Sequence, residues 1–259
     1  MNPIRELVQY SYLILSFARR DIRARYKQTA LGAAWAVLQP LSLMIVFTLV
    51  FDKVARIPTD GTPYPLFSFS ALIFWSFFST SMSQGTFAMT SNSNLVRKIY
   101  FPRETLLLAV MLSASLDLAI ACAMLGVLLV LYGSTISWTV LWVPLLLGLQ
   151  VLFTLALICF TSAVHVYFRD IGHALSLGLQ LWMFATPVAY PMSVVPQSVR
   201  SWYLLNPMAP IIDGYRRAIL YGQPPDLPRL GIVLLFVTAL LFLTYFGFKR
   251  AERTFADVI

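Results

Sequence analysis

The sequence predicts an all-α integral membrane protein that forms a single domain over residues 1–259. The chain is 59% hydrophobic and only 12% charged, with a mean hydropathy of +0.75, and a soluble domain carries about twice that charge. Its apolar stretches are long enough to cross a membrane. Gln28–Phe51 holds 24 residues without a charge, and a helix needs about 20 to cross the hydrocarbon core. This pattern leaves no room for a soluble domain.

Residues 4–27 are expected to form an amphipathic helix. Apolar residues recur at spacings of three, four and seven, and basic residues take the other side. A basic amphipathic helix next to a span lies in the plane of the membrane interface. The alternative is a plain juxtamembrane anchor. A cleaved signal peptide is not expected, because Arg19 and Arg20 follow the apolar stretch Tyr10–Ala18 instead of preceding it.

Six membrane spans are predicted. They are Leu31–Phe51, Leu66–Met89, Leu106–Tyr132, Val140–Tyr167, Ile171–Tyr190 and Leu230–Phe248. The third and fourth divide at Gly133-Ser134-Thr135, because a charge-free run of 51 residues, Leu118–Phe168, is too long for one crossing. With the N-terminus inside, 13 Lys and Arg residues fall on inside segments and 6 on outside segments. This bias predicts that both termini are cytoplasmic.

The inside connection Ser91–Glu104 combines positive charge with an aromatic centre. Arg97, Lys98 and Arg103 surround Tyr100-Phe101-Pro102. This composition suits a small helix that lies on the surface of a partner protein. An aromatic anchor at the membrane interface is the alternative.

The outer connection Pro191–Pro228 is expected to hold two short helices that do not span. The first runs from Pro196 to about Leu205, and the second follows the cap Asn206-Pro207 and ends near Tyr221. The second helix has an apolar stripe and a polar side. The stripe contains Met208, Ile211, Ile212, Tyr215 and Ile219, whereas Asp213, Arg216 and Arg217 are expected to face away from it. A re-entrant or interface-lying pair explains this pattern, with an ordinary surface loop as the alternative.

The sequence contains no soluble catalytic constellation. It lacks a GxxxxGK[ST] phosphate loop, so this chain is not expected to bind ATP in that manner. The net charge of +8 fits contact with anionic lipid, and no compact nucleic-acid motif accompanies it. His165 and His173 flank Arg169-Asp170 without an acidic or cysteine cluster, so no metal site is expected. Cys122 and Cys159 are interpreted as small apolar fillers within spans.

Asp117 is the one acid well inside a predicted span. It lies about 16 Å along the helix from Leu106, where an unpaired carboxylate is costly. Ser113 and Ser115 suggest a polar patch around it. Proton coupling is one hypothesis. A neutral hydrogen bond between helices is favoured, because no basic partner is evident within the membrane.

Aromatic residues make up 14% of the chain, and most are expected to face lipid or the interface. Sugar rings also pack on aromatic faces. Four candidates for lining a sugar path are Trp35, Phe74, Trp75 and Trp182.

Several local strings, in order along nearly the whole chain, resemble the ABC-2 type exporter permeases. They are Asp21-Ile22-Arg23-Ala24-Arg25-Tyr26, Leu31-Gly32-Ala33-Ala34-Trp35, Gln39-Pro40, Phe101-Pro102-Arg103-Glu104, Tyr167-Phe168-Arg169-Asp170-Ile171, Thr186-Pro187, Tyr190-Pro191, Asn206-Pro207-Met208 and Tyr215-Arg216. Each string is weak alone, and together they are specific. The pattern looks most like the O-antigen and related polysaccharide export permeases, with capsule and teichoic-acid relatives close behind.

The resemblance implies a homodimer of six-span subunits in the bacterial inner membrane, with two copies of a separate ATPase subunit that bind ATP and magnesium. It implies export of a lipid-linked glycan and no cofactor in this chain. Three groups of residues then acquire expected roles. The interface helix would meet the substrate head group through Arg19, Arg20, Arg23 and Arg25. The ATPase would be coupled through Arg97, Lys98, Tyr100, Phe101, Pro102 and Arg103. The external gate would contain Asn206, Pro207, Tyr215 and Arg216.

Two other kinds of function stay open at the level of the sequence. One is an ABC-2 exporter of a small drug or lipid. The other is a proton-coupled carrier or membrane enzyme built around Asp117, which would work without an ATPase.

Overall fold

The computed structural model describes residues 9–27, 29, 31–59, 61–196, 198, 203 and 205–258, and within these ranges the chain is helical without a β-strand. The helices, in order, are α2 Ser11–Tyr26, α3 Trp35–Phe47, α4 Tyr64–Ser91, α5 Ser93–Lys98, α6 Glu104–Leu131, α7 Val143–Tyr167, α8 Ile171–Ala185, α10 Met208–Ile219, α11 Leu227–Ala251 and α12 Phe255–Val258. Short 3₁₀ or π segments extend several of them. The all-α prediction is therefore confirmed for the described residues.

Five helical segments are long and apolar enough to cross a membrane. They are Gly32–Val54, Tyr64–Ser91, Glu104–Leu131, Trp138–Tyr167 and Leu227–Thr254. Each matches one predicted span to within a few residues at its start. The remaining predicted span, Ile171–Tyr190, is helical over only the 15 residues of α8. That helix ends because Pro187 disfavours the helical conformation at Thr186, which is extended with φ −107° and ψ 141°.

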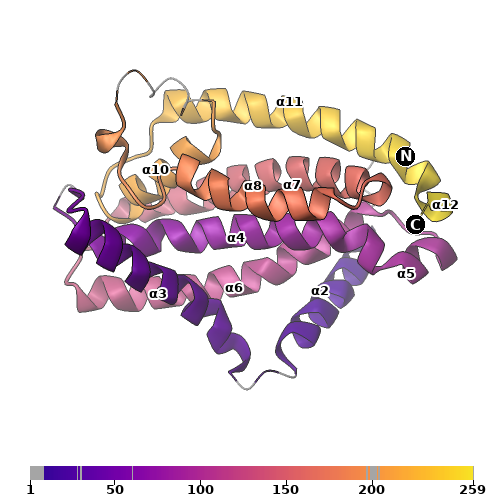
Figure 1. Cartoon of the computed structure of the whole chain (residues 1–259), viewed down its shortest axis with the longest axis horizontal. Helices are drawn as coiled ribbons and strands as arrows, with labels where there is room; N and C mark the ends of the chain where they lie inside the picture. Colours follow the sequence, from indigo (N-terminus) through magenta and orange to yellow (C-terminus); the bar gives the residue numbers. More distant parts are fainter. Residues whose placement is uncertain are drawn as a thin grey trace.

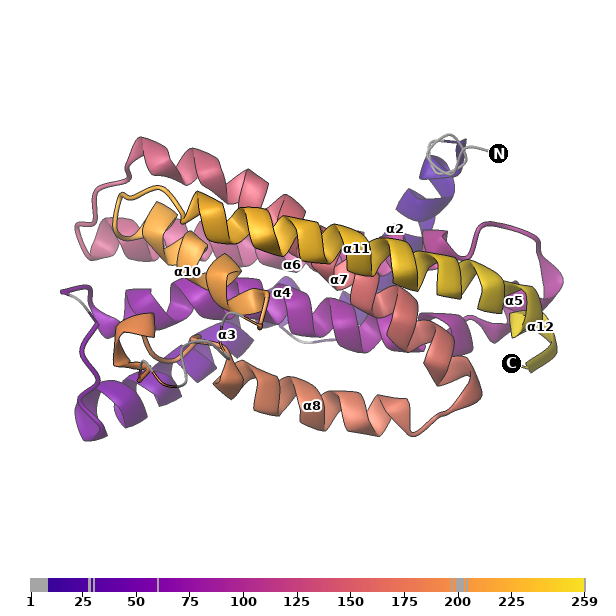
Figure 2. The same cartoon turned by 90° about the horizontal axis from the view of Figure 1, so that it is seen from above.

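Helix α4 forms the centre of the bundle and is buried on nearly all sides. It packs against α3, α6, α7, α8 and α10, and Figure 1 shows it running through the middle of the molecule. Figure 2 shows α8 at the edge of the bundle away from α11. The contact between α4 and α7 is close at Gly85, where a Cβ atom would lie 2.5 Å from Cγ2 of Ile158. Small residues allow such close approach between membrane helices.

The N-terminal region folds back on the bundle. Helix α2 packs along α6, and α3 packs on α4 and α6; the two meet in a bend outside the bundle (Figure 1). Helix α2 confirms a helix in the described part of the predicted segment 4–27, whose first residues, 4–8, lie outside the described ranges. A position at the membrane interface stays a prediction.

Of the two predicted outer helices, the structure describes the second in full and only a few residues of the first. The second is α10, and Gly222 with φ +61° follows it in a turn. The first, Pro196–Leu205, falls largely on residues outside the described ranges. Helices α5 and α10 lie at opposite ends of the bundle (Figure 1), so the two predicted connections mark its two ends.

Candidate functional site

The end of α2 is fastened to α6 and α4 by a cluster of polar side chains. Arg25 and Tyr26 both donate to the carboxylate of Asp117, and the Arg25 and Asp117 side chains are 23% and 22% exposed. The Arg25 guanidinium also donates to Gln84 Oε1 at 2.6 Å and to Ser113 Oγ at 3.3 Å. Burial, followed by the hydrogen bond to Asp117, raises the pKa of Tyr26 to about 12. Tyr26 is thus a neutral donor at physiological pH.

This cluster corrects two expectations. Asp117 was expected to have no basic partner, yet Arg25 reaches it from 92 residues earlier in the chain. Arg25 was also grouped with the residues that meet a head group, but its guanidinium is engaged within the bundle. Spacing along one helix cannot reveal a partner on another helix that folds back.

The other three basic candidates of α2 are exposed. Arg20 pairs with Asp21 at 2.8 Å and lies over the ring of Phe17, with 5.1 Å between Cζ and the ring centroid. Arg19 and Arg23 remain on the surface. Arg19, Arg20 and Arg23 therefore form an exposed basic surface on α2 that does not include Arg25.

The predicted coupling residues divide into an exposed and a buried group. Arg97, Lys98 and Tyr100 are exposed, with Tyr100 at 92%. Phe101, Pro102 and Arg103 are buried. The connection therefore presents α5 and Tyr100 outward and holds its second half inside the chain.

Several contacts hold that second half in place. Phe101 packs on Phe17 of α2 with ring centroids 5.9 Å apart. Arg103 donates from Nη1 to the carbonyl of Val96 at 2.7 Å and from its backbone N–H to Glu252 Oε1 at 3.0 Å. Lys249 then bridges Glu252 and Glu104, at 2.9 and 2.8 Å. These contacts join the connection after α5 to α2 and to the end of α11.

The predicted gate residues Asn206 and Pro207 lie at the start of α10. The Asn206 side chain accepts from the Met208 N–H at 3.1 Å and from Trp182 Nε1 at 3.0 Å, and it donates to Thr186 Oγ1 at 2.9 Å. Asn206 therefore caps α10 and ties it to the end of α8.

Tyr215 and Arg216 of α10 are both buried. Tyr215 stacks on Phe74 with ring centroids 3.5 Å apart and donates to Gln150 Oε1 at 2.9 Å. Arg216, only 2% exposed, was expected to face away from the apolar stripe, and this expectation is wrong. Its guanidinium donates to four main-chain carbonyls, those of Phe67, Pro187, Val188 and Tyr190.

Arg216 also lies over the ring of Phe67 at 3.6 Å. Burial lowers the pKa of its guanidinium to about 10, so the group stays charged at neutral pH. Three of its carbonyl partners belong to residues 187–190, just after α8, where the backbone has left the helix. A charged donor there satisfies main-chain groups that would otherwise be unpaired.

The four aromatic candidates for lining a sugar path differ in their exposure. Trp35 is 51% exposed on α3, whereas Phe74 and Trp75 are buried in α4. Trp182 packs edge-on against Phe78 and Phe153. Phe74, Trp75 and Trp182 thus fill space between helices of one chain, and Trp35 is the candidate on an outer face.

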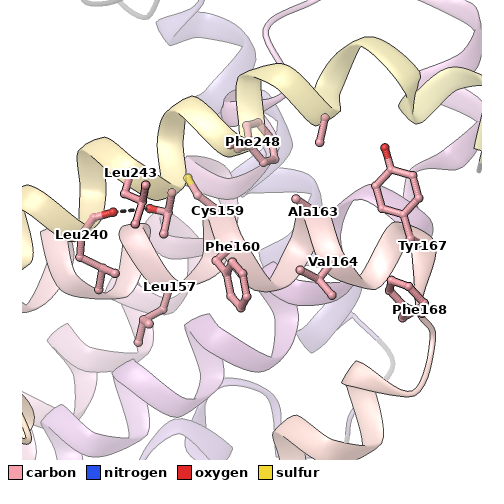
Figure 3. A pocket seen from close by; sticks show the side chains of 13 residues that line it. Leu157, Cys159, Phe160, Ala163, Val164, Tyr167, Phe168, Leu240, Leu243 and Phe248 are labelled. Atoms are coloured by element: carbon pink, nitrogen blue, oxygen red, sulfur yellow. Dashed lines mark hydrogen bonds between the residues drawn. The ribbon is translucent and has the colours of Figure 1, made fainter.

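Two apolar hollows lie between α7 and α11. One, of about 640 Å³, is lined by apolar side chains that include Cys159, Phe160 and Leu243, and Figure 3 shows these residues facing it from both helices. A second, of about 630 Å³, lies towards Pro144 and Leu227. Both hollows are thus lined mainly by apolar side chains of two long apolar helices.

Sequence reasoning missed Gln84 and Gln150. Each is a polar residue inside a predicted apolar span, and each serves as the partner of a functional candidate, Arg25 or Tyr215. An amide within an apolar span was the available signal.

A profile of the ABC-2 type transporters matches residues 12–220. The chain belongs to the ABC-2 type transporter family. The match runs from α2 through α10, so it includes the polar cluster at Asp117, the α5 connection and Arg216.

The ABC-2 chain also has relatives similar over nearly its whole length. An O-antigen export system permease protein, RfbA, of Myxococcus xanthus is 35% identical over 260 residues, which cover 99% of this chain and 98% of the relative. An RfbA of Klebsiella pneumoniae is 28% identical over 252 residues, 95% of each chain. The polysialic acid transport protein KpsM of Escherichia coli is 22% identical over 247 residues, 90% of this ABC-2 chain and 91% of the relative.

Proposed function

We propose that this chain is the permease subunit of an ATP-driven exporter that moves a lipid-linked polysaccharide, O-antigen, across the bacterial inner membrane. The similarity to RfbA of Myxococcus xanthus over 99% of the chain carries this proposal. The chain has no phosphate loop, so a separate ATPase subunit would bind ATP and magnesium. This chain is then a transporter subunit without catalytic residues or cofactors of its own.

The working assembly is a homodimer of six-span subunits with two ATPase subunits, and both termini are cytoplasmic. In this arrangement α8 and residues 186–190 together form the fifth crossing. Leu177, Leu181 and Phe184 on α8 are exposed apolar residues, which supports cover by lipid or by a second copy. The bias of basic residues supports the orientation.

The polysaccharide would cross between the two copies. Each sugar hydroxyl would lose water hydrogen bonds in hydrocarbon at a cost of about 1–3 kcal/mol, so a long glycan requires a wet channel. The buried positions of Phe74 and Trp75 favour a path at the seam over a path through one subunit. Trp35, which is exposed on α3, is the aromatic candidate for lining it.

The proposed roles of the candidate residues rest on their exposure and on their position in the bundle. Arg97, Lys98 and Tyr100 form the surface that docks on the ATPase, and Phe101, Pro102 and Arg103 pass its motion to α2 and α11. Arg19, Arg20 and Arg23 attract the anionic lipid head group at about 1 kcal/mol per basic residue. At the other end, α10 with Asn206, Pro207, Tyr215 and Arg216 forms the exit gate.

Deletion and complementation test the function. We expect a strain without this chain to lose surface O-antigen and to accumulate lipid-linked glycan on the cytoplasmic side, and the wild-type gene to restore export. The tagged chain should co-purify with an ATPase encoded beside it. Normal surface glycan in the deletion strain, or export without any ATPase, would rule the proposal out.

Capsular polysaccharide is the second candidate cargo, because KpsM is similar to 90% of this chain. Teichoic acid or a small lipid would use the same fold. Chemical analysis of the glycan that accumulates in the deletion strain separates these cases. A proton-coupled carrier or enzyme built on Asp117 is disfavoured, because Arg25 holds that carboxylate in an ion pair.

A further inference from the structure

A polar cavity of about 490 Å³ opens where the C-terminal ends of α4 and α7 meet the beginning of α8. Its lining includes Ser91, Ser93, His165, Arg169 and His173. The cavity lies at the end of the bundle that carries α5. No carboxylate lines it among the described residues, and Asp170 stands beside Arg169 in the sequence without contributing to the lining. Among the described side chains that line it, Arg169 therefore carries a positive charge that no carboxylate balances.

His165 is fixed in the wall of this cavity. It is only 4% exposed, and its ring packs edge-on against Phe87 with centroids 4.6 Å apart. The start of α8 closes over both rings, because a Cβ atom at Gly172 would lie 2.4 Å from Phe87 Cζ and 3.4 Å from His165 Cε1. The imidazole therefore has little freedom to turn towards another partner.

The buried Nδ1 of His165 has no hydrogen-bond partner among the described residues. A buried N–H without a partner is rarer than a buried acceptor without one, so the favoured tautomer leaves Nδ1 unprotonated and places the proton on Nε2. Nε2 is not among the buried atoms without a partner, so its N–H is free to donate to solvent or to a ligand. Since His165 lines the cavity, a ligand in the cavity is positioned to accept from it.

The rest of the lining offers more donors. The side-chain hydroxyls of Ser91 and Ser93 and the guanidinium of Arg169 make no hydrogen bond or ion pair within the described part of the chain. Arg20, by contrast, lines a neighbouring cavity that shares Phe87 and Ser91 with this one, and it forms an ion pair with Asp21. A guanidinium without a partner among the described residues, together with hydroxyl and imidazole donors, matches the oxygens of a phosphate.

We propose that this cavity binds a phosphate-type oxyanion through Arg169, His165 and the two serines. The position at the end of the membrane helices suits the pyrophosphate of a lipid carrier, and a soluble pyrophosphate offers the same oxygens. This inference deepens the proposed function and rests on it for the lipid source. It moves the principal head-group contact from α2 to the start of α8.

Equilibrium binding tests the site on the full chain in phosphatidylcholine nanodiscs. The probes are radiolabelled polyprenyl pyrophosphate, the corresponding polyprenol, and inorganic pyrophosphate as competitor. We expect polyprenyl pyrophosphate to bind, and Arg169→Gln and His165→Phe each to weaken binding about tenfold or more. Arg253→Gln, an exposed arginine at the same end that does not line the cavity, is the matched control and should bind as the wild type does.

The competitor identifies the source of the phosphate. Displacement by inorganic pyrophosphate at similar concentrations supports a soluble anion, and displacement by polyprenyl pyrophosphate alone supports the lipid. Equal binding of polyprenol, or unchanged binding by Arg169→Gln, would overturn the site. Arg169→Gln carries the test if His165→Phe fails to fold, because Arg169 is on the surface.

Two further outcomes separate an oxyanion site from a surface that docks the ATPase. Loss of ATPase co-purification in Arg169→Gln with normal pyrophosphate binding would make the cavity a docking surface and would overturn the proposal. Normal glycan export by a variant that no longer binds pyrophosphate would also overturn the site, while leaving the proposed function intact.

Discussion

Asp117, inside helix α6, pairs with Arg25, which lies 92 residues earlier on α2. The pair decides how the N-terminal helix sits on the bundle, since Tyr26 donates to the same carboxylate. An ion pair between a helix that precedes the first span and the middle of a later span resists separation of the two. Movement of α2 during transport would have to carry α6 with it or break this pair.

Removing one partner of this pair should destabilise the protein. We expect Asp117→Asn to lower the free energy of unfolding by about 1–3 kcal/mol, because Arg25 keeps its charge without a carboxylate. Thermal unfolding of the purified chain in detergent measures this. The double variant Arg25→Gln/Asp117→Asn, which removes both charges, should lose less than the sum of the single variants. Additive losses would mean that the pair does not couple α2 to α6.

Arg216 should not tolerate replacement by lysine. Lysine keeps the charge but lacks the planar fork that reaches four carbonyls, so Arg216→Lys should cost about 2–4 kcal/mol of stability. Arg217→Lys is the matched control, because Arg217 is partly exposed and donates to one carbonyl, that of Pro224, at 3.1 Å. Thermal unfolding of both variants gives the comparison, and equal stability would contradict the role assigned to Arg216.

The close contact between α4 and α7 makes a specific prediction for Gly85. Gly85→Ala should destabilise by about 1–3 kcal/mol, because the new methyl overlaps Ile158. Adding Ile158→Ala removes the clashing atoms, so the double variant should lose less stability than the two single losses combined. Gly126→Ala, where a Cβ atom meets nothing within 4 Å, should be neutral or slightly stabilising. The midpoint of thermal unfolding reports all four variants.

Charge reversal on α5 should separate ATP hydrolysis from export. Arg97→Glu with Lys98→Glu changes exposed side chains, so the protein should still fold and reach the membrane. The ratio of ATP hydrolysed to glycan exported should rise at least several-fold, because like charges at an interface that is complementary in the wild type weaken docking. Lys53→Glu, an exposed lysine outside α5 that pairs with Asp52, is the control. An unchanged ratio would remove Arg97 and Lys98 from the coupling surface.

The sequence was enough to place the long apolar helices, because a charge-free run of membrane length has few other interpretations. The second predicted span, Leu66–Met89, lies within α4, and the third, Leu106–Tyr132, differs from α6 by two residues at its start. Helix α10 was also predictable from its cap and stripe. These features depend on residues close together in the sequence.

The polar contacts were not predictable in the same way. Arg216 was expected to face away from the apolar stripe of its helix, but its partners are main-chain carbonyls. Carbonyl groups occur at every residue, so the sequence does not indicate which of them a side chain will meet. The partner of Asp117 depends on how α2 folds back. The length of α8 was overestimated because an apolar composition continues past the residue at which Pro187 ends the helix.

The early end of α8 connects the length of this helix with the contacts of Arg216. A 15-residue helix is about 22 Å long, shorter than the roughly 30 Å hydrocarbon core, and irregular backbone at that depth is tolerated only where protein covers it. Arg216 supplies that cover from α10. An insertion that lengthened α8 would occupy the carbonyls and leave a buried guanidinium unpaired, so helix length and this arginine would have to change together during evolution or redesign.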